Sequence, residues 1–234
     1  MTLLTKKVFL FLFFSLFFQS CKFSNKNYIE IVKNKESKTI NSININNLLK
    51  ELIVSDGELI PKLVVLEDGR ERYNYIKLPG DDDLNLKEIK KRILLGPDYY
   101  KKDREKISIL RKKINELGIN NQITNIESGA LGTWTSNKKL IQIDQKVVKR
   151  GSRIFLDVLN HESVHIAQSC FNGSIDSYPK RIGLPLEFSK NLELNLSHNL
   201  YSKNTEEGLY IEREAFTYSK VEDAALKLIE KFCM

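Results

Sequence analysis

The sequence lacks several features that mark whole classes of protein. In its 234 residues, no apolar run reaches the roughly 20 residues that a membrane-spanning helix needs. It contains no internal repeat, and no module of interleaved basic and aromatic residues of the kind that binds nucleic acid. Histidine and cysteine are scarce, at three residues each. With 41% hydrophobic and 29% charged residues, the chain suits one globular domain with appendages.

The first twenty residues have the pattern of a secretory signal. Two lysines precede an apolar run over residues 8–18, and polar and small residues follow it. A short buried helix is the alternative, but no polar residues alternate with the apolar ones to give it an exposed face. The segment Phe18-Gln19-Ser20-Cys21 resembles a bacterial lipobox. This resemblance implies that Cys21 is lipid-modified and that the protein is exported, membrane-anchored and faces the periplasm or the cell exterior.

The expected organisation is a signal peptide over residues 1–20, a flexible tether over 21–47 and one domain over 48–234. The tether is rich in lysine and asparagine and has few large apolar clusters. Without residues 1–20, which hold two lysines and no acid, the net charge falls from +7 to +5. The lysines are dispersed and an exported protein does not meet the chromosome, so we expect no nucleic-acid partner. Weak attraction to anionic lipid headgroups is the most this charge supports.

If Cys21 carries lipid, Cys170 and Cys233 remain as a pair in a compartment that permits disulfides. We expect them to be joined, since a crosslink at the penultimate residue would hold an end that otherwise frays. Two reduced, buried thiols are the alternative.

Hydrophobic periodicity and turn residues predict a mixture of helices and short strands. The predicted strands form a hairpin around Asp68-Gly69 and a small sheet, over residues 62–66, 72–76, 123–127, 131–135 and 139–144. The predicted helices cover residues 84–95, 103–117, 152–171, 186–200 and 205–232. The fold class is therefore α+β.

The predicted helix 152–171 contains His161-Glu162-Ser163-Val164-His165, with two of the three histidines of the chain. Residues four apart share one helix face, so both imidazoles can reach one metal ion. Glu162 is placed to take a proton from metal-bound water. Two surface histidines are the bland alternative, but apolar residues surround the motif and indicate a buried helix, in which histidines need partners.

This motif resembles the zincin metallopeptidases. The resemblance covers the motif helix, the sheet before it and the last helix, and it implies a zincin-like α+β fold with one zinc ion. In that family a sheet edge before the motif helix lines the substrate cleft, which would place residues 131–135 or 140–144 beside the substrate. The metzincin branch is excluded, because Gln168 and Phe171 stand where its glycine and third histidine would be.

The gluzincin branch takes its third zinc ligand from a later helix. Here Glu212-Arg213-Glu214-Ala215 resembles its Glu-x-x-Ala-Asp pattern, with Phe216 in place of the aspartate. By resemblance Glu212 is the ligand. Helix geometry leaves Glu214 open, because Glu214 lies on an apolar stripe while Glu212 lies on a stripe of small residues. We expect Glu212 to bind the metal and Glu214 to serve as the alternative, or to hold a ligand histidine.

The sequence thus predicts an exported, lipid-anchored zinc peptidase acting on a peptide or protein substrate. His161, His165 and Glu212 would hold zinc, and Glu162 would be the general base. Two rivals remain. One is a non-catalytic envelope lipoprotein with a zincin-like fold and a structural or vestigial metal, and the other is a hydrolase of a non-peptide amide. His198 is expected to be an exposed polar residue rather than a participant.

Overall fold

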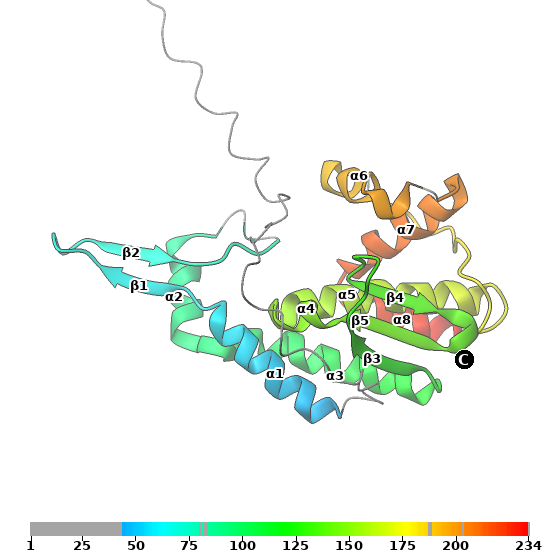
Figure 1. Ribbon diagram of the computed structural model, residues 1–234, viewed down its shortest axis with the longest axis horizontal. Coiled ribbons are helices and arrows are strands. Elements are labelled where there is room, and N and C mark those ends of the chain that lie inside the picture. The colour runs from blue at the N-terminus through cyan, green and yellow to red at the C-terminus, as the bar shows by residue number, and fades with distance from the viewer. Residues whose placement is uncertain (1–43, 80, 82–83, 187–188, 203, 234) are drawn as a thin grey trace, which may run out of the picture. The chain divides into compact units, whose positions relative to one another are not determined.

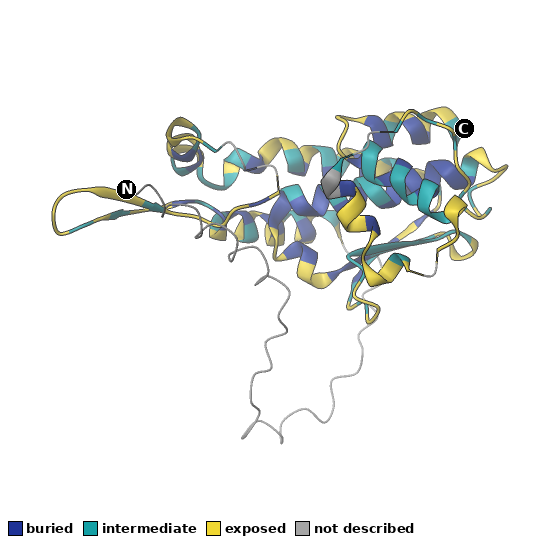
Figure 2. Ribbon diagram, turned by 90° about the horizontal axis from the view of Figure 1, so that it is seen from above, coloured by how far each residue is buried: buried dark blue, intermediate teal, exposed yellow. Residues whose placement is uncertain are grey.

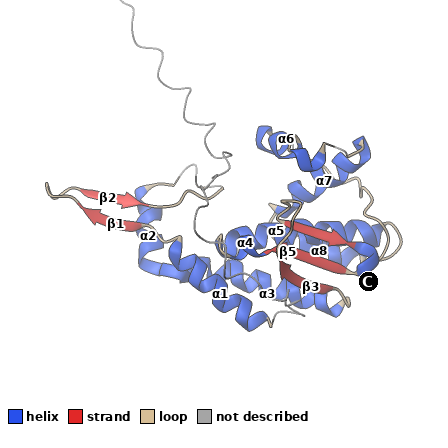
Figure 3. Cartoon of the chain, in the orientation of Figure 1, coloured by secondary structure: helices blue, strands red, loops and turns tan. Residues whose placement is uncertain are grey.

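The computed structural model describes residues 44–79, 81, 84–186, 189–202 and 204–233. The expected signal peptide, Cys21 and most of the expected tether lie outside this part. The α-helices are α1 (Ile45–Glu58), α2 (Leu86–Leu95), α3 (Lys101–Glu116), α4 (Gln145–Val148), α5 (Gly151–Phe171), α6 (Lys190–Leu196), α7 (Glu206–Ser219) and α8 (Ala224–Phe232) (Figure 1). The strands are β1 (Lys62–Val65), β2 (Glu71–Asn74), β3 (Asn120–Thr124), β4 (Gly132–Thr135) and β5 (Leu140–Asp144) (Figure 3). The fold is α+β, as predicted.

Helix α5 is the centre of the described residues. It packs against α1, α3, α7, α8 and strand β4. Side chains on several of its sides are buried, among them Ile154, Phe155, Leu159, Val164 and Ile166. A helix that is apolar on most sides needs such a shell of neighbours. No described helix combines the length and the apolar character that crossing a bilayer requires.

The start of α5 is fixed by a buried carboxylate from another helix. Asp56 of α1 accepts hydrogen bonds from the backbone N–H and the hydroxyl of Ser152, at 2.7 and 2.6 Å. Arg104 of α3 pairs with the same carboxylate. Gly151 precedes this contact with φ of +84°, and a Cβ there would lie 2.8 Å from an Asp56 oxygen. The charge of Asp56 thus caps the positive end of α5 and sets where the helix begins.

The three-stranded sheet has the order β3–β5–β4, with β3 parallel and β4 antiparallel to β5. Ile141, Ile143 and Asp144 of the central strand are buried, whereas Leu140 and Gln142 are only partly so. Strand β4 is an edge strand, and it lies against α5. The indole N–H of Trp134 donates to the hydroxyl of Ser169, at 2.9 Å, and joins that edge to the helix.

The hairpin β1–β2 forms around Asp68-Gly69, as expected, and Gly69 has a φ of +81° that a glycine adopts without strain. It is a separate two-stranded sheet, and most of its residues are exposed (Figure 2). It lies apart from the sheet that borders α5.

Besides the last helix, three sequence expectations need correction. The first small-sheet strand covers Asn120–Thr124 rather than 123–127, and the helix expected over 186–200 is reduced to α6 and the short 3-10 turn Asn199–Tyr201. Helix α1 was not predicted, and it includes residues 45–47 of the expected tether.

The largest correction concerns the last helix. The single helix expected over 205–232 is two helices, because α7 ends at Ser219 and α8 begins at Ala224. The amide of Asn160 in α5 donates to the carbonyl oxygen of Ser219, at 3.2 Å, and so occupies an acceptor that a continuous helix would need. Asp223 adopts a left-handed φ of +58° at the start of the next helix.

Cys170 and Cys233 form a disulfide that joins the end of α5 to the end of α8. We expect a variant with both cysteines replaced by serine to lose about 2–4 kcal/mol in its free energy of unfolding, because the bond closes a long loop and restricts the unfolded chain. Urea denaturation without reductant measures this loss. The matched control is Cys21→Ser, which leaves this loop closed and is expected to unfold like the parent. Equal stability of all three proteins would contradict the prediction.

Candidate metal centre

Helices α5 and α7 bring three side chains together that could hold a metal ion. His161 and His165 are one turn apart on α5, with their Nε2 atoms 3.2 Å from each other. Glu212 of α7 places Oε2 3.2 Å from Nε2 of His161 and 3.6 Å from Nε2 of His165. Ligand atoms about 2 Å from a tetrahedral zinc ion are about 3.3 Å from one another. The spacing of the three side chains therefore fits one zinc ion.

Unsatisfied polar atoms at this cluster also fit a metal. Oε2 of Glu212 is buried and accepts no well-oriented hydrogen bond, although it lies close to both imidazoles. Buried carboxylate oxygens rarely stay unpaired. A cation bound between the histidines and Glu212 would satisfy this atom, so the donor set and its burial suit a divalent metal.

Glu214, the alternative ligand, points away from the histidines and is fully buried. Its carboxylate accepts hydrogen bonds from the backbone N–H groups of residues 182–184, at 2.7–2.9 Å. It also accepts from the side-chain amide of Gln168, at 3.0 Å. These donors are backbone and amide N–H groups of the protein itself. The side chains close enough to share one metal ion are His161, His165 and Glu212, so Glu212 and not Glu214 is the candidate ligand.

Glu162 is buried between the metal cluster and the sheet edge. The backbone of β4 approaches it so closely that a Cβ on Gly132 would lie 2.7 Å from its Oε1. Burial raises the pKa of the Glu162 carboxyl and the charge of Glu212 raises it further, against the lowering effect of the two histidines and of the Trp134 backbone N–H. A carboxylate with a raised pKa beside a metal site is suited to accept a proton near neutral pH.

Aromatic side chains form one wall of the site. The ring of Phe216 packs on His161 with centroids 4.5 Å apart, and the ring of Tyr201 is 6.0 Å from Phe216. Burial raises the pKa of Tyr201, and the charges of Glu212 and Glu162 raise it further. Its hydroxyl therefore remains a hydrogen-bond donor. The sequence did not separate Tyr201 from the other tyrosines, whereas Phe216 shares a helix face with Glu212, four residues earlier.

Gln168 contacts one of the two histidines of the cluster, and His198 is the third histidine of the chain. Gln168 lies one turn after His165 and places its amide oxygen 2.7 Å from Nδ1 of that histidine. In the sequence, Gln168 served only to exclude the metzincin branch. Its i, i+3 spacing from His165 is the signal that could have identified it. His198 accepts a hydrogen bond from the backbone of Leu200 in an exposed turn and is not part of the metal cluster.

No family model, curated protein or solved structure matches this chain. The case for a function therefore rests on the side chains themselves.

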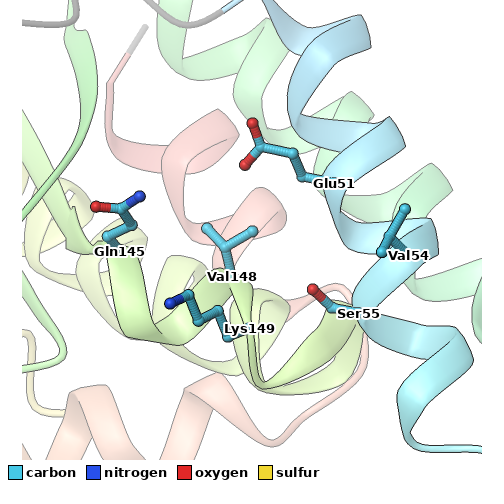
Figure 4. Close-up of a pocket in the computed structure, with 6 residues that line it drawn as sticks. All are labelled: Glu51, Val54, Ser55, Gln145, Val148 and Lys149. Carbon is cyan, nitrogen blue, oxygen red and sulfur yellow. The ribbon is translucent and has the colours of Figure 1, made fainter.

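A cavity of about 260 Å³ lies elsewhere, between α1 and α4 (Figure 4). Its lining residues are Glu51, Val54, Ser55, Gln145, Val148 and Lys149. None of them belongs to the metal cluster. The chemistry-bearing side chains lie at the junction of α5, α7 and β4 instead.

The charges at the cluster predict how metal binding depends on pH. Burial lowers the pKa of His165, but the charges of Glu212 and Glu162 and the hydrogen bonds to Glu212 and Gln168 together raise this pKa to about 9. Burial raises the pKa of Glu212, but the neighbouring histidine charges hold it well below its usual range. Without metal, a protonated His165 therefore faces an ionised Glu212.

Zinc binds only the unprotonated imidazole. We expect zinc affinity to rise by up to about tenfold per pH unit between about pH 7 and 9, and to level off above. The pKa of His165 is higher in the folded chain than the ordinary histidine value of 6.5, so its bound proton contributes stability to the metal-free fold that is fully present below pH 6.5. This stabilisation is lost as the pH rises through about 9. Chelator-competition titrations and urea denaturation across this range measure both trends, and a flat zinc affinity would contradict the prediction.

Proposed function

We propose that the chain is a zinc-dependent peptidase of zincin-like, gluzincin type. The observation that carries this proposal is the convergence of His161, His165 and Glu212 beside the buried carboxylate of Glu162. Three protein ligands and an adjacent base are the composition of a catalytic zinc site. In the described part of the chain the cluster has three members, whereas a structural zinc site usually has four.

In this proposal zinc, when bound, supplies a Lewis acid and makes water more acidic. The two histidines and Glu212 hold the ion. Glu162 removes a proton from the attacking water and later passes it to the leaving nitrogen. Tyr201 donates a hydrogen bond to the carbonyl oxygen as negative charge develops there.

The edge of the sheet supports a peptide as the substrate. Strand β4 borders Glu162 through Gly132, and among the described strands it pairs only with β5. An extended peptide can pair with the free side of such a strand. Of the two segments that the sequence left open, β4 and not β5 lies at the edge next to the base.

The place of action is proposed from the sequence alone. The signal-like residues 1–20 and the lipobox-like Cys21 support an exported protein that is anchored by lipid to a membrane. A peptide or protein in the cell envelope would then be the substrate. A non-catalytic envelope lipoprotein that uses the same fold for binding is the second candidate.

The test is a proteolysis assay with the detergent-solubilised full chain and a fluorescently labelled, unfolded protein. We expect cleavage that stops when a zinc chelator is added and returns when zinc is restored. Zinc binding without cleavage of protein, peptide or simple amide substrates would favour the non-catalytic lipoprotein. Cleavage of an amide but no peptide would favour the other hydrolase.

A further inference from the structure

A chain of hydrogen bonds runs from a loop through Glu214 and Gln168 to the metal cluster. The backbone N–H groups of residues 182–184 donate to the carboxylate of Glu214. Nε2 of Gln168 donates to Oε2 of Glu214, at 3.0 Å, and Oε1 of Gln168 lies 2.7 Å from Nδ1 of His165. Glu214 and Gln168 are both fully buried. Water therefore does not replace these partners.

The carboxylate of Glu214 determines which group donates and which accepts in each of these hydrogen bonds. A carboxylate oxygen accepts hydrogen bonds, and both oxygens of Glu214 already accept from backbone N–H groups, which cannot turn away. The amide nitrogen of Gln168 must face it, and the same nitrogen also donates to the backbone carbonyl of Ile211, at 3.0 Å. Turning the amide over would set its oxygen against two acceptors. Its oxygen is thus fixed toward His165.

An amide oxygen can only accept, so Nδ1 of His165 must carry the proton. In a neutral imidazole the other nitrogen is then unprotonated. That nitrogen is Nε2, the atom that lies 3.6 Å from Glu212 in the metal cluster. We infer that Glu214 sets the tautomer of His165 through Gln168, and that both are positioning residues which keep Nε2 free to bind metal. This inference rests on the metal site of the proposed function but not on its peptidase activity.

A purely structural role for Glu214 makes a different prediction. If Glu214 only anchored residues 182–184, its neutralisation would lower stability and leave the protonation pattern of His165 unchanged. The tautomer is therefore the readout that separates the two roles. Long-range ¹H–¹⁵N correlation spectra distinguish protonated from unprotonated imidazole nitrogens and can be recorded on the metal-free full chain at a pH above the His165 pKa of about 9, where its imidazole is neutral.

The first variant is Glu214→Gln, which keeps the size of the side chain and removes its charge. Its amide can donate to Gln168, so that Gln168 can turn its own N–H toward Nδ1 of His165. We expect the spectra to show protonation at Nε2 in a share of the molecules. We also expect zinc affinity, measured against a competing chelator, to fall by about 10–100-fold, which is typical when the partner of a ligand histidine is lost.

The second variant exchanges the carboxylate and the amide between positions 168 and 214, so that a hydrogen-bond acceptor again faces Nδ1 of His165. In Gln168→Glu/Glu214→Gln, the new carboxylate at position 168 accepts from Nδ1 of His165 and also from the new amide at position 214, but it loses the hydrogen bond to the carbonyl of Ile211. We expect this double variant to regain the Nδ1-protonated tautomer and part of the zinc affinity that the single variant loses. A general loss of stability would not be reversed in this way.

The matched control is Ser152→Ala, which removes a buried hydrogen bond at the other end of α5. It is expected to lower stability and to leave both tautomer and zinc affinity unchanged. An unchanged tautomer in Glu214→Gln would overturn the inference, as would a double variant no better than the single one. If the parent binds no zinc, the metal site is wrong, but the tautomer in the metal-free protein still decides whether this chain of hydrogen bonds acts as inferred.

Discussion

Replacing Glu162 by glutamine is expected to reduce hydrolysis by about 10²–10⁴-fold, the usual contribution of a positioned proton acceptor. Glutamine has the same size, so it fits the narrow space beside Gly132, where a Cβ would already be too close to Oε1. It cannot accept a proton from water. The three zinc ligands are unchanged, and zinc content by mass spectrometry should equal that of the parent.

The matched control for this variant is Glu207→Gln, which makes the same chemical change at an exposed position in the first turn of α7. Its activity should match the parent within error. Full activity of Glu162→Gln would remove Glu162 from the mechanism, and simultaneous loss of zinc would show that Glu162 supports the metal rather than the chemistry.

Replacing Glu212 by glutamine is expected to weaken zinc binding by more than about 100-fold. Loss of a partner behind a ligand already costs about 10–100-fold, and Glu212 would contact the ion itself. The substitution would also remove the negative charge of Glu212, whose Oε2 lies 3.2 and 3.6 Å from the Nε2 atoms of the two histidines. Chelator-competition titration measures the loss, with circular dichroism to show that the helices remain.

The comparison with Glu214→Gln makes this second prediction decisive. Glu214 is satisfied by backbone and amide donors and is expected to affect zinc only through Gln168. Glu212→Gln should therefore lose more zinc affinity than Glu214→Gln. The opposite order would make Glu214 the third ligand and would reverse the assignment that the geometry supports.

The parts of the site that the sequence predicted are those that depend on local spacing. The helix expected over residues 152–171 is observed at Gly151–Phe171, because its apolar pattern and its histidine spacing are properties of one helix. Helix α1 had a similar local signal in Leu48 and Leu52, which are fully buried. The sequence does not predict this helix, because α1 begins at Ile45, among asparagines that favour a tether over 21–47.

The parts that the sequence left open depend on contacts between distant residues. Glu212 and Glu214 are two positions apart and so point to different sides of α7, and only the packing of α7 on α5 shows which one meets the histidines. The break after Ser219 depends on Asn160, 59 residues earlier in the chain. The role of Gln168 depends on Glu214, 46 residues later. No local pattern contains these partners.

The disulfide also determines what a backbone cut would do to the proposed metal site. Cys170 and Cys233 enclose the whole of α7, so Glu212 lies inside a covalent ring that is closed onto the helix of His161 and His165. Lys180, which is exposed, lies within the same ring. A protease that cuts after Lys180 would therefore yield a nicked protein whose two fragments migrate as one band without reductant and as two with it. In the nicked form all three candidate ligands would still belong to one covalent molecule.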